Sequence, residues 1–372
     1  MAELKTYRAK RDSKRTPEPV PRSDKPGQRK RKQAGKARFV IQEHHARALH
    51  WDFRLERDGV MVSWAVPKNL PVDPKTNHLA VHTEDHPMEY LDFAGDIPAG
   101  EYGGGTVAIW DRGTYQTEKW NDREVMVVLS GKKVSGKYVL FKTGSRDRDW
   151  MVHRMDPPAA GFAPMPEDLL PMRADITSRL PRDDGQWGYE FSWDGVRAVV
   201  SIDGGRPRAI DAGGEDITGQ YPELREMAER IGSQRLILDG ELVVLDADGR
   251  PQPEALKSRT DARDRAAVQR RMKQSAVSYL ITDLLYRDGA LLVDKTYRDR
   301  RTTLDELRLK GPHWHATPWF RGNGAAVRDA ARGQGLSGIV MKRLDSTYNP
   351  GTTSKDWRQL PIPTAKPKRT GG

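Results

Sequence analysis

A short alternating segment at residues 49–55 most constrains what this chain can fold into. Its apolar residues occupy the odd positions and its polar residues occupy the even positions: Leu49, Trp51, Phe53 and Leu55 against His50, Asp52 and Arg54. Side chains of a β-strand alternate between its two faces. The pattern therefore predicts a strand with one face in a core and the other face carrying chemically active groups.

A series of similar short patterns follows between residues 38 and 143, with Gly or Asp-Gly turns between several of them. The predicted strands lie at residues 38–43, 50–57, 60–66, 78–84, 106–111, 113–118, 124–130 and 137–143. Regular spacing with little helical periodicity predicts a mainly-β barrel or sandwich over residues 37–158. We expect the mouth of such a barrel to gather His44, His50, Asp52, Arg54 and His86.

Two imidazoles and one carboxylate, from His44, His50 and Asp52, form a mixed nitrogen and oxygen ligand set for a divalent metal. The neighbouring guanidinium of Arg54 suits a phosphate. An ordinary amphipathic strand is the alternative interpretation, but two His, an Asp and an Arg within eleven residues favour a functional site. Non-haem Fe(II) oxygenases use the same kind of ligand set. The arginine favours a phosphate substrate instead.

The net charge of +11 is concentrated at the ends of the chain. Residues 1–38 hold fourteen Lys or Arg against four Asp or Glu, and residues 364–372 add three cations without an acid. We predict a largely disordered basic arm at 1–36 that contacts nucleic acid, and a basic tail at 364–372. The absence of cysteine excludes disulfide and zinc–thiolate sites. With no apolar run long enough to span a bilayer, we expect a cytoplasmic, nucleoid-associated protein without a membrane partner.

Five motifs in order, at residues 7–19, 42–55, 62–68, 84–90 and 97–105, resemble the 3'-phosphoesterase domain of the bacterial ligase D family. The resemblance covers about residues 7–156. It implies Mn²⁺ or another divalent metal at His44, His50 and Asp52, and DNA 3' ends as substrates. These are primer-template ends that carry a terminal ribonucleotide or a 3'-phosphate. The residues that match the family's catalytic and substrate-binding positions are His86, Arg54 and Tyr90, with Arg11, Asp12, Glu18 and His78. His78 stands where the family commonly has arginine.

From residue 187 on, strand and helix patterns alternate, which predicts an α+β domain at 186–363 after a Pro-rich linker at 159–185. The predicted elements lie at residues 188–202, 221–231, 236–245, 264–274, 277–286, 297–309, 324–334 and 338–343. Motifs at 190–197, 238–241, 282–286, 337–343 and 348–351 resemble the adenylation domain of ATP-dependent DNA ligases over about residues 164–361. The predicted fold is thus a β-barrel followed by a nucleotidyltransferase-like domain.

Several departures from the ligase pattern predict a degenerate nucleotide site. Ser192 replaces the lysine nucleophile, Thr282 replaces an aromatic residue and Ser337 replaces a glutamate. Gln359 and Pro361 replace two further lysines. Asp194, Arg197, Glu241 and Lys342 match the family. We therefore do not expect ATP as a cofactor, nor, since the sequence as given ends near residue 372, the oligonucleotide-binding barrel that follows in ligases.

The combined prediction is a metal-dependent enzyme that processes DNA 3' ends during nonhomologous end joining and carries an inactive ligase-like domain. Candidate partners are DNA 3' ends, a Ku-type end-binding protein and a repair polymerase. An active ATP-dependent DNA ligase and a non-enzymatic end-joining scaffold are the alternatives.

Overall fold

The computed structural model describes residues 4–21, 36–144 and 146–363. The chain divides into two compact units that meet between Phe162 and Ala163. Each unit is described by itself. None of the helices in the described ranges combines the length and the apolarity that crossing a membrane requires.

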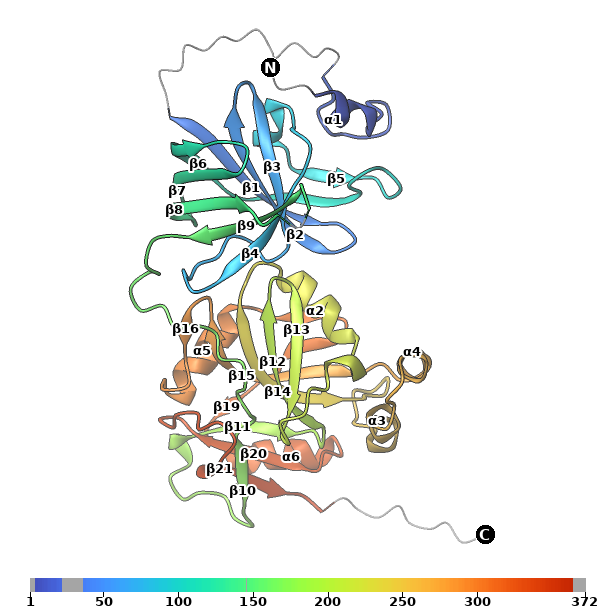
Figure 1. Ribbon diagram of the computed structural model, residues 1–372. Coiled ribbons are helices and arrows are strands. Elements are labelled where there is room, and N and C mark those ends of the chain that lie inside the picture. The colour runs from blue at the N-terminus through green and yellow to red at the C-terminus, as the bar shows by residue number, and fades with distance from the viewer. Residues whose placement is uncertain (1–3, 22–35, 145, 364–372) are drawn as a thin grey trace. The chain divides into compact units, whose positions relative to one another are not determined.

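Eight strands of the first unit close into an antiparallel barrel (Figure 1). The order around the barrel is β1-β2-β3-β4-β9-β8-β7-β6, and β6 pairs back with β1, while β5 is added alongside β6. The strands are β1 Ala37–His45, β2 Leu49–Arg57, β3 Val60–Val66, β4 Asn77–His82, β5 Gly95–Ile97, β6 Gly105–Trp120, β7 Glu124–Gly131, β8 Ser135–Lys142 and β9 Asp149–Arg154. The barrel predicted from the alternating patterns is confirmed.

Strand boundaries differ from the prediction at β6, β5 and β9. The patterns at 106–111 and 113–118 form one continuous strand, because Gly113 does not turn the chain. A Cβ at Gly113 would lie 2.1 Å from the carbonyl oxygen of Ser130 on β7. The glycine thus permits a close approach between paired strands. The short strands β5 and β9 were not predicted.

The barrel wall separates two apolar clusters. The interior cluster contains the odd-numbered residues of the alternating segment, Leu49, Trp51, Phe53 and Leu55, together with residues of β7, β8 and β9. A second cluster lies outside β1 and β3 and contains Leu4, Tyr7, Val40, Val60, Met61, Tyr90 and Leu91. Strands β1 and β3 are therefore buried on both faces where the second cluster covers them.

The outer cover is built by α1, Lys5–Ala9, and by the 3-10 helix η1, Met88–Asp92. Tyr7 of α1 is fully buried, and its hydroxyl donates a hydrogen bond of 2.9 Å to the carbonyl of Pro19. Residues 4–21, which belong to the basic arm that we predicted for residues 1–36, thus pack against the barrel. Most of the remaining arm, residues 22–35, lies outside the described residues.

The second unit contains two β-sheets with helices, as the α+β prediction requires. A seven-stranded sheet has the order β13-β12-β14-β15-β18-β17, with β16 paired to β15, and a five-stranded sheet has the order β10-β21-β20-β11-β19. The strands are β10 Arg173–Ile176, β11 Trp187–Ser192, β12 Val196–Asp203, β13 Arg206–Asp211, β14 Leu236–Val243, β15 Ser278–Arg287, β16 Ala290–Leu291, β17 Lys310–Gly311, β18 Trp314–Ala316, β19 Phe320–Arg321, β20 Gly338–Arg343 and β21 Thr353–Pro361. The helices are α2 Glu223–Ile231, α3 Pro253–Thr260, α4 Arg265–Gln274, α5 Tyr297–Glu306 and α6 Gly324–Gly333, with short 3-10 turns η2 Asp184–Gln186 and η3 Thr218–Gln220.

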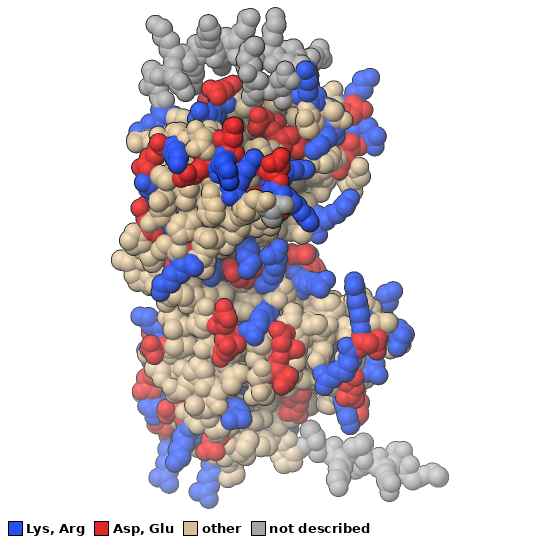
Figure 2. All heavy atoms as spheres, in the orientation of Figure 1, with Lys and Arg blue, Asp and Glu red and all other residues tan. Residues whose placement is uncertain are grey.

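The stretch predicted as a linker, residues 159–185, contributes to the second unit. Its strand β10 pairs in parallel with β21, and Met172 just before it is fully buried. The boundary between the compact units therefore lies earlier than the end of the predicted linker. On the face of the molecule that Figure 2 shows, acidic and basic side chains are interspersed over both units.

Candidate functional site

The candidate metal residues lie on the outer face of the barrel, close to the turn that joins β1 and β2. His44 on β1 is directly opposite His50 on β2 in the antiparallel ladder, and Asp52 lies two residues further along β2 on the same face. The alternation predicted from the sequence is therefore present. The predicted position at the barrel mouth is wrong, because the even-numbered side chains point away from the interior cluster and toward the outer cover.

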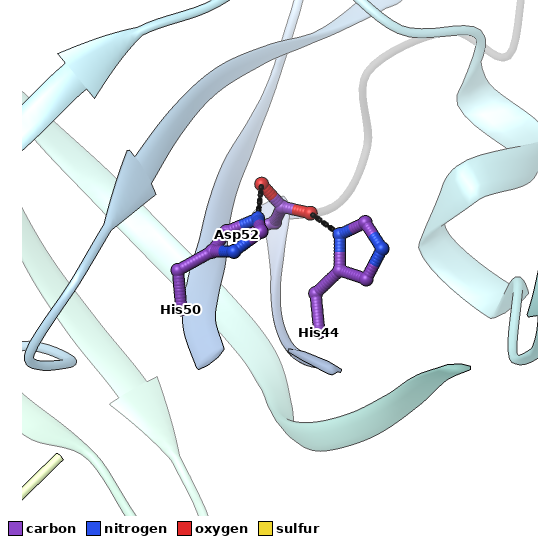
Figure 3. A group of neighbouring side chains, drawn as sticks. All are labelled: His44, His50 and Asp52. Carbon is purple, nitrogen blue, oxygen red and sulfur yellow. Dashed lines mark ion pairs between the residues drawn. The ribbon is translucent and has the colours of Figure 1, made fainter. Parts of the chain in front are cut away.

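The carboxylate of Asp52 lies between the two imidazoles (Figure 3). Its Oδ2 is 3.4 Å from Nδ1 of His44, and its Oδ1 is 3.7 Å from Nε2 of His50. One ligand atom from each of the three residues lies within 4.8 Å of the others. His44 and Asp52 are buried, and His50 is half-buried. This geometry suits one divalent cation with a side open to solvent.

Backbone carbonyls orient both imidazoles for metal binding. Nε2 of His44 lies 2.8 Å from the carbonyl oxygen of Gly103, and Nδ1 of His50 lies 3.0 Å from that of Ala48. A carbonyl oxygen only accepts, so these nitrogens are assigned the protons. In the neutral rings the other nitrogens then present lone pairs toward Asp52. A metal-binding histidine is held in this way, with its second nitrogen bound to a carbonyl. The residues therefore fit a divalent metal.

Arg54 is buried behind Asp52 and is held by three polar partners. Its Nε donates to Gln42, its Nη1 donates to Ser63 and its Nη2 donates to Asp52, at 2.7 to 2.9 Å. Burial alone would raise the pKa of Asp52, but the guanidinium of Arg54 holds that pKa well below its usual range. Asp52 is consequently ionised, as a metal ligand must be.

The ordered N-terminal segment brings two of the predicted substrate-binding residues over the site. Nε of Arg11 donates to Glu18 at 2.8 Å, and Glu18 also accepts a hydrogen bond from the hydroxyl of Tyr90. Burial raises the pKa of Tyr90, and the negative charge of Glu18 raises it further. Tyr90 therefore keeps its proton. The guanidinium of Arg54 lies 4.7 Å from the centre of its ring.

His86 packs beside the same tyrosine. Its Nδ1 is 2.8 Å from the carbonyl oxygen of Glu84, and its ring centre is 4.7 Å from that of Tyr90 and 5.0 Å from that of Tyr7. Burial lowers the pKa of His86 well below its usual value, and the neighbouring arginines lower it further. The ring is therefore neutral, with its proton on Nδ1 and an acceptor at Nε2.

Two predicted substrate-binding residues are not brought into this cluster. Asp12 is exposed, and its carboxylate accepts a hydrogen bond of 2.9 Å from the backbone N–H of Lys14. His78 and Ala80 are two residues apart on β4, so their side chains lie on the same face of the strand, and Ala80 belongs to the interior cluster. Nδ1 of His78 is 2.7 Å from the carbonyl oxygen of Asn69. His78 therefore lies on the opposite side of the barrel wall from the metal residues.

Sequence reasoning missed the residues that support the site. Gln42 and Ser63, both fully buried, hold Arg54, while Gly103 supplies the carbonyl for His44. For two of these residues, the sequence contains an indication of their role. Gln42 shares the parity of His44 on β1, and Ser63 is the one polar residue in the apolar run of β3. The sequence does not indicate the role of Gly103, because that role depends on its backbone carbonyl.

The candidate nucleotide residues of the second unit are divided between its two sheets. Ser192, Ser337 and Lys342 belong to or directly precede strands of the five-stranded sheet, and Arg197, Glu241 and Thr282 lie on the seven-stranded sheet. Asp194 is exposed in the turn between β11 and β12. The hydroxyl of Ser192, where ligases have the lysine nucleophile, accepts a hydrogen bond of 3.1 Å from Gln359.

Lys342 is enclosed by an ion pair and aromatic rings. Its ammonium lies 2.8 Å from Glu190, and both side chains are only 2% exposed. The same ammonium is 4.1 Å from the ring centre of Trp357. Tyr297 donates a hydrogen bond of 2.6 Å to the other oxygen of Glu190. The lysine that matches the ligase pattern is therefore already paired within the fold.

Arg197 and Glu241 also have partners within the fold. Arg197 contacts both carboxylate oxygens of Asp239, and Glu241 accepts a hydrogen bond of 3.0 Å from the backbone N–H of Gly195. Burial raises the pKa of Glu241. Thr282 donates to the carbonyl of Asp239 at 3.3 Å.

Comparisons with known proteins agree with the two units. The family described as DNA Ligase D 3'-phosphoesterase domain matches residues 42–142, and the family described as ATP dependent DNA ligase domain matches residues 171–360. The multifunctional non-homologous end joining protein LigD of Mycobacterium bovis is 42% identical over 95% of this chain and 44% of its own length. The LigD protein of Pseudomonas aeruginosa is 34% identical over 96% of this chain and 47% of its own length.

Among solved structures, mycobacterial DNA ligase D complexed with ATP and MES matches 52% of this chain and 60% of that chain, at 33% identity and a TM-score of 0.46. The chain spans less than half the length of the two LigD relatives. The chain belongs to the ligase D family, with a 3'-phosphoesterase domain followed by an ATP-dependent DNA ligase domain.

Proposed function

We propose that the first unit is a metal-dependent phosphoesterase that removes a 3'-terminal ribonucleotide or a 3'-phosphate from DNA ends. The observation that carries the proposal is the arrangement of His44 and His50 around Asp52, with both imidazole lone pairs directed at one carboxylate. Names of the LigD relatives place such proteins in non-homologous end joining. We extend that role in double-strand-break repair to this chain.

His44, His50 and Asp52 would hold the metal, for which we propose Mn²⁺. A divalent ion there supplies Lewis-acid polarisation of the scissile phosphate. Arg54 adds a fixed positive charge next to this position, and its contacts with Gln42 and Ser63 prevent it from turning away. Such preorganised charge stabilises the phosphate oxygens as negative charge builds up on them.

His86 would accept a proton rather than donate one. Its Nδ1 hydrogen is bound to the carbonyl of Glu84, so only the lone pair of Nε2 is available to substrate or water. The low pKa of His86, caused by burial and by the nearby arginines, opposes the protonated form that a general acid needs. We therefore assign His86 the role of base or hydrogen-bond acceptor, and Tyr90 a supporting role through Glu18.

We propose that the ligase-like unit is catalytically inactive. The phosphoramidate intermediate of a ligase needs an amine nucleophile, whereas Ser192 offers a hydroxyl that is bound to Gln359. Lys342 is engaged by Glu190. Incubation with α-labelled ATP and Mg²⁺ or Mn²⁺ should leave no acid-stable label on the protein, and Ser192→Lys alone should not restore it. A labelled band that Lys342→Ala removes would overturn this proposal.

The first unit is tested with a 5'-labelled primer-template that ends in one ribonucleotide, incubated with the full chain and Mn²⁺. We expect a product shortened by one nucleoside, followed by loss of its 3'-phosphate, and no reaction in EDTA. An all-deoxy primer without a 3'-phosphate serves as the control substrate. DNA binding without turnover would instead support a non-enzymatic scaffold.

A further inference from the structure

An exposed tyrosine lies beside the candidate metal residues and has no part in the chemistry described above. Tyr102 is 45% exposed, in the loop between β5 and β6. The next residue, Gly103, holds Nε2 of His44 through its carbonyl. Among the described residues with exposed large apolar side chains, Tyr102 is the only tyrosine or tryptophan. Its ring is thus presented to solvent one residue away from a support of a metal ligand.

The loop that carries Tyr102 is fixed by its own backbone. The N–H of Glu101 donates to the carbonyl of Pro98, and the N–H of Gly104 donates to the carbonyl of Glu101, each at 3.1 Å. Gly103 has a φ of +77°, in the left-handed region that favours glycine. Two consecutive tight turns therefore set the position of the ring without help from a ligand.

The N-terminal segment holds the same ring from its side. Nζ of Lys10 donates a hydrogen bond of 3.0 Å to the tyrosine hydroxyl and lies 4.4 Å from the ring centre, and the guanidinium of Arg11 lies 5.2 Å from that centre. Both cations are anchored by Glu84, at 2.9 Å and 3.1 Å. The exposed aromatic surface is therefore bordered by fixed positive charge.

A fixed, exposed aromatic ring bordered by cations has the chemistry of a platform for one nucleobase. Aromatic side chains stack on bases with little sequence preference, and neighbouring cations attract the backbone phosphates. A preorganised ring loses little conformational freedom when a base stacks on it.

The two proposed substrates identify which base would be bound. In a 3'-phosphate end and a ribonucleotide-terminated end alike, the nucleoside next to the scissile phosphate is the one whose 3'-oxygen carries it. We propose that Tyr102 stacks on the base of this nucleoside and so positions the 3' end for the reaction. This inference rests on the proposed phosphoesterase function, and it makes Tyr102 a positioning residue.

The test compares Tyr102→Ala with Tyr102→Phe on primer-templates that end in a 3'-phosphate, with either a normal base or an abasic site at the terminal nucleoside. Tyr102→Ala should raise KM about tenfold on the normal end, the scale of one lost base stack, and leave kcat nearly unchanged. On the abasic end the same variant should match the wild-type chain. Tyr102→Phe keeps the ring but loses the hydrogen bond from Lys10, and should stay close to wild type.

A binding measurement separates this inference from the proposed function. A terminal 2-aminopurine should lose fluorescence on binding to the wild-type chain and to Tyr102→Phe, but not on binding to Tyr102→Ala. If the wild-type chain turns over neither substrate, the phosphoesterase proposal fails and the fluorescence still decides whether the base stacks. Equal KM increases on normal and abasic ends, a loss confined to kcat, or unchanged quenching in Tyr102→Ala would each overturn the inference.

Discussion

The two candidate sites of this chain differ in what their charged groups contact. In the first unit, the lone pairs of His44 and His50 are directed at a single carboxylate, an arrangement that a cation would complete. In the second unit, Lys342 faces Glu190 and Arg197 faces Asp239, so that each charge is already balanced by a neighbour. Matching motifs thus accompany a His/Asp ligand set in one unit, beside the ion pair of Asp52 with Arg54, and ion pairs without such a ligand set in the other.

This contrast shows that a motif match locates residues but does not reveal whether their polar atoms are available. The Ser-Trp-Asp-Gly motif of the second unit aligns with ligases, yet its first hydroxyl is engaged by Gln359. Availability depends on side-chain partners that come from distant strands. The following experiments test this difference between the sites.

The largest effect is expected for the metal residues. His44→Ala, His50→Ala and Asp52→Ala should each remove essentially all 3'-end processing, because a metal site that loses one of three protein ligands rarely keeps its geometry. His45→Ala is the matched control, since the imidazole of His45 contacts Glu43 and lies outside the ligand group. Gel assays of primer shortening with Mn²⁺ measure the effect. Equal losses in the control, or activity that persists in EDTA, would contradict the metal assignment.

Removing the ion pair between Lys342 and Glu190 should lower the stability of the second unit and leave end processing unchanged. Lys342→Met leaves Glu190 buried without its cation, and we expect it to destabilise this unit by about 3–5 kcal/mol. The double variant Lys342→Met/Glu190→Gln should recover much of that loss. Hydrogen exchange of amides in β20 and β11 measures the change. If Lys342→Met were neutral, the pair would not be the closed contact that distinguishes this site.

A smaller effect concerns pH. Burial lowers the pKa of His86 and of His82, and nearby cations lower both further. The unfolded chain therefore takes up protons that the folded chain resists once the pH falls below about 6.5, the ordinary histidine value. Barrel stability should be complete above that pH and should fall by up to about 1.4 kcal/mol per pH unit for each histidine below it.

Hydrogen exchange of barrel amides at pH 7.5 and 5.5, corrected for intrinsic rates, measures this dependence. His86→Gln and His82→Gln should each flatten it, because glutamine does not titrate in this range. His45→Gln serves as the control. A dependence that both variants leave unchanged would show that other groups cause it.

The smallest effect is expected for the basic arm. Replacing Arg22, Lys25, Arg29, Lys30, Arg31 and Lys32 by glutamine should weaken DNA binding and flatten its dependence on salt concentration, because each released counterion contributes to the slope. Turnover at saturating DNA should stay near that of the wild-type chain. The replacements avoid Leu4 and Tyr7, which are buried in the outer cover. An unchanged slope of log affinity against log salt would exclude the arm as a DNA contact.

Much of the first unit could be predicted because strand periodicity is local. The alternation at residues 49–55 assigned Leu49, Trp51, Phe53 and Leu55 to the core and the polar residues to the other face. Closure of the barrel depends instead on the pairing of β1 with β6, between strands about seventy residues apart. The sequence alone does not show which strands pair or which barrel surface a given face becomes. The site was therefore placed at the mouth instead of on the outer wall.

The supporting contacts of the site could be predicted least. Glu18 meets Tyr90 across 72 residues, and Lys10 meets Tyr102 across 92 residues. Such contacts depend on how the N-terminal segment folds back onto the barrel. That arrangement could not be predicted, because the segment is rich in cations and proline and has no clear periodicity. In the ligase-like unit, the substitution of Ser192 was visible, but its hydrogen bond with Gln359 across 167 residues was not.

The cross-strand pairing of His44 with His50 has a consequence for how this protein can change over evolutionary time. A slip of one residue between β1 and β2 would move four large apolar side chains of β2 out of the core. At about 1.5–3 kcal/mol each, that loss is comparable to the whole stability of a domain. The hydrophobic interior thus fixes the pairing of β1 with β2, and with it the positions of His44 and His50, whether or not these residues bind a metal. Replacement of His44 or His50 would leave these four side chains in the core, so the proposed ligand set can be lost from this domain without loss of its architecture.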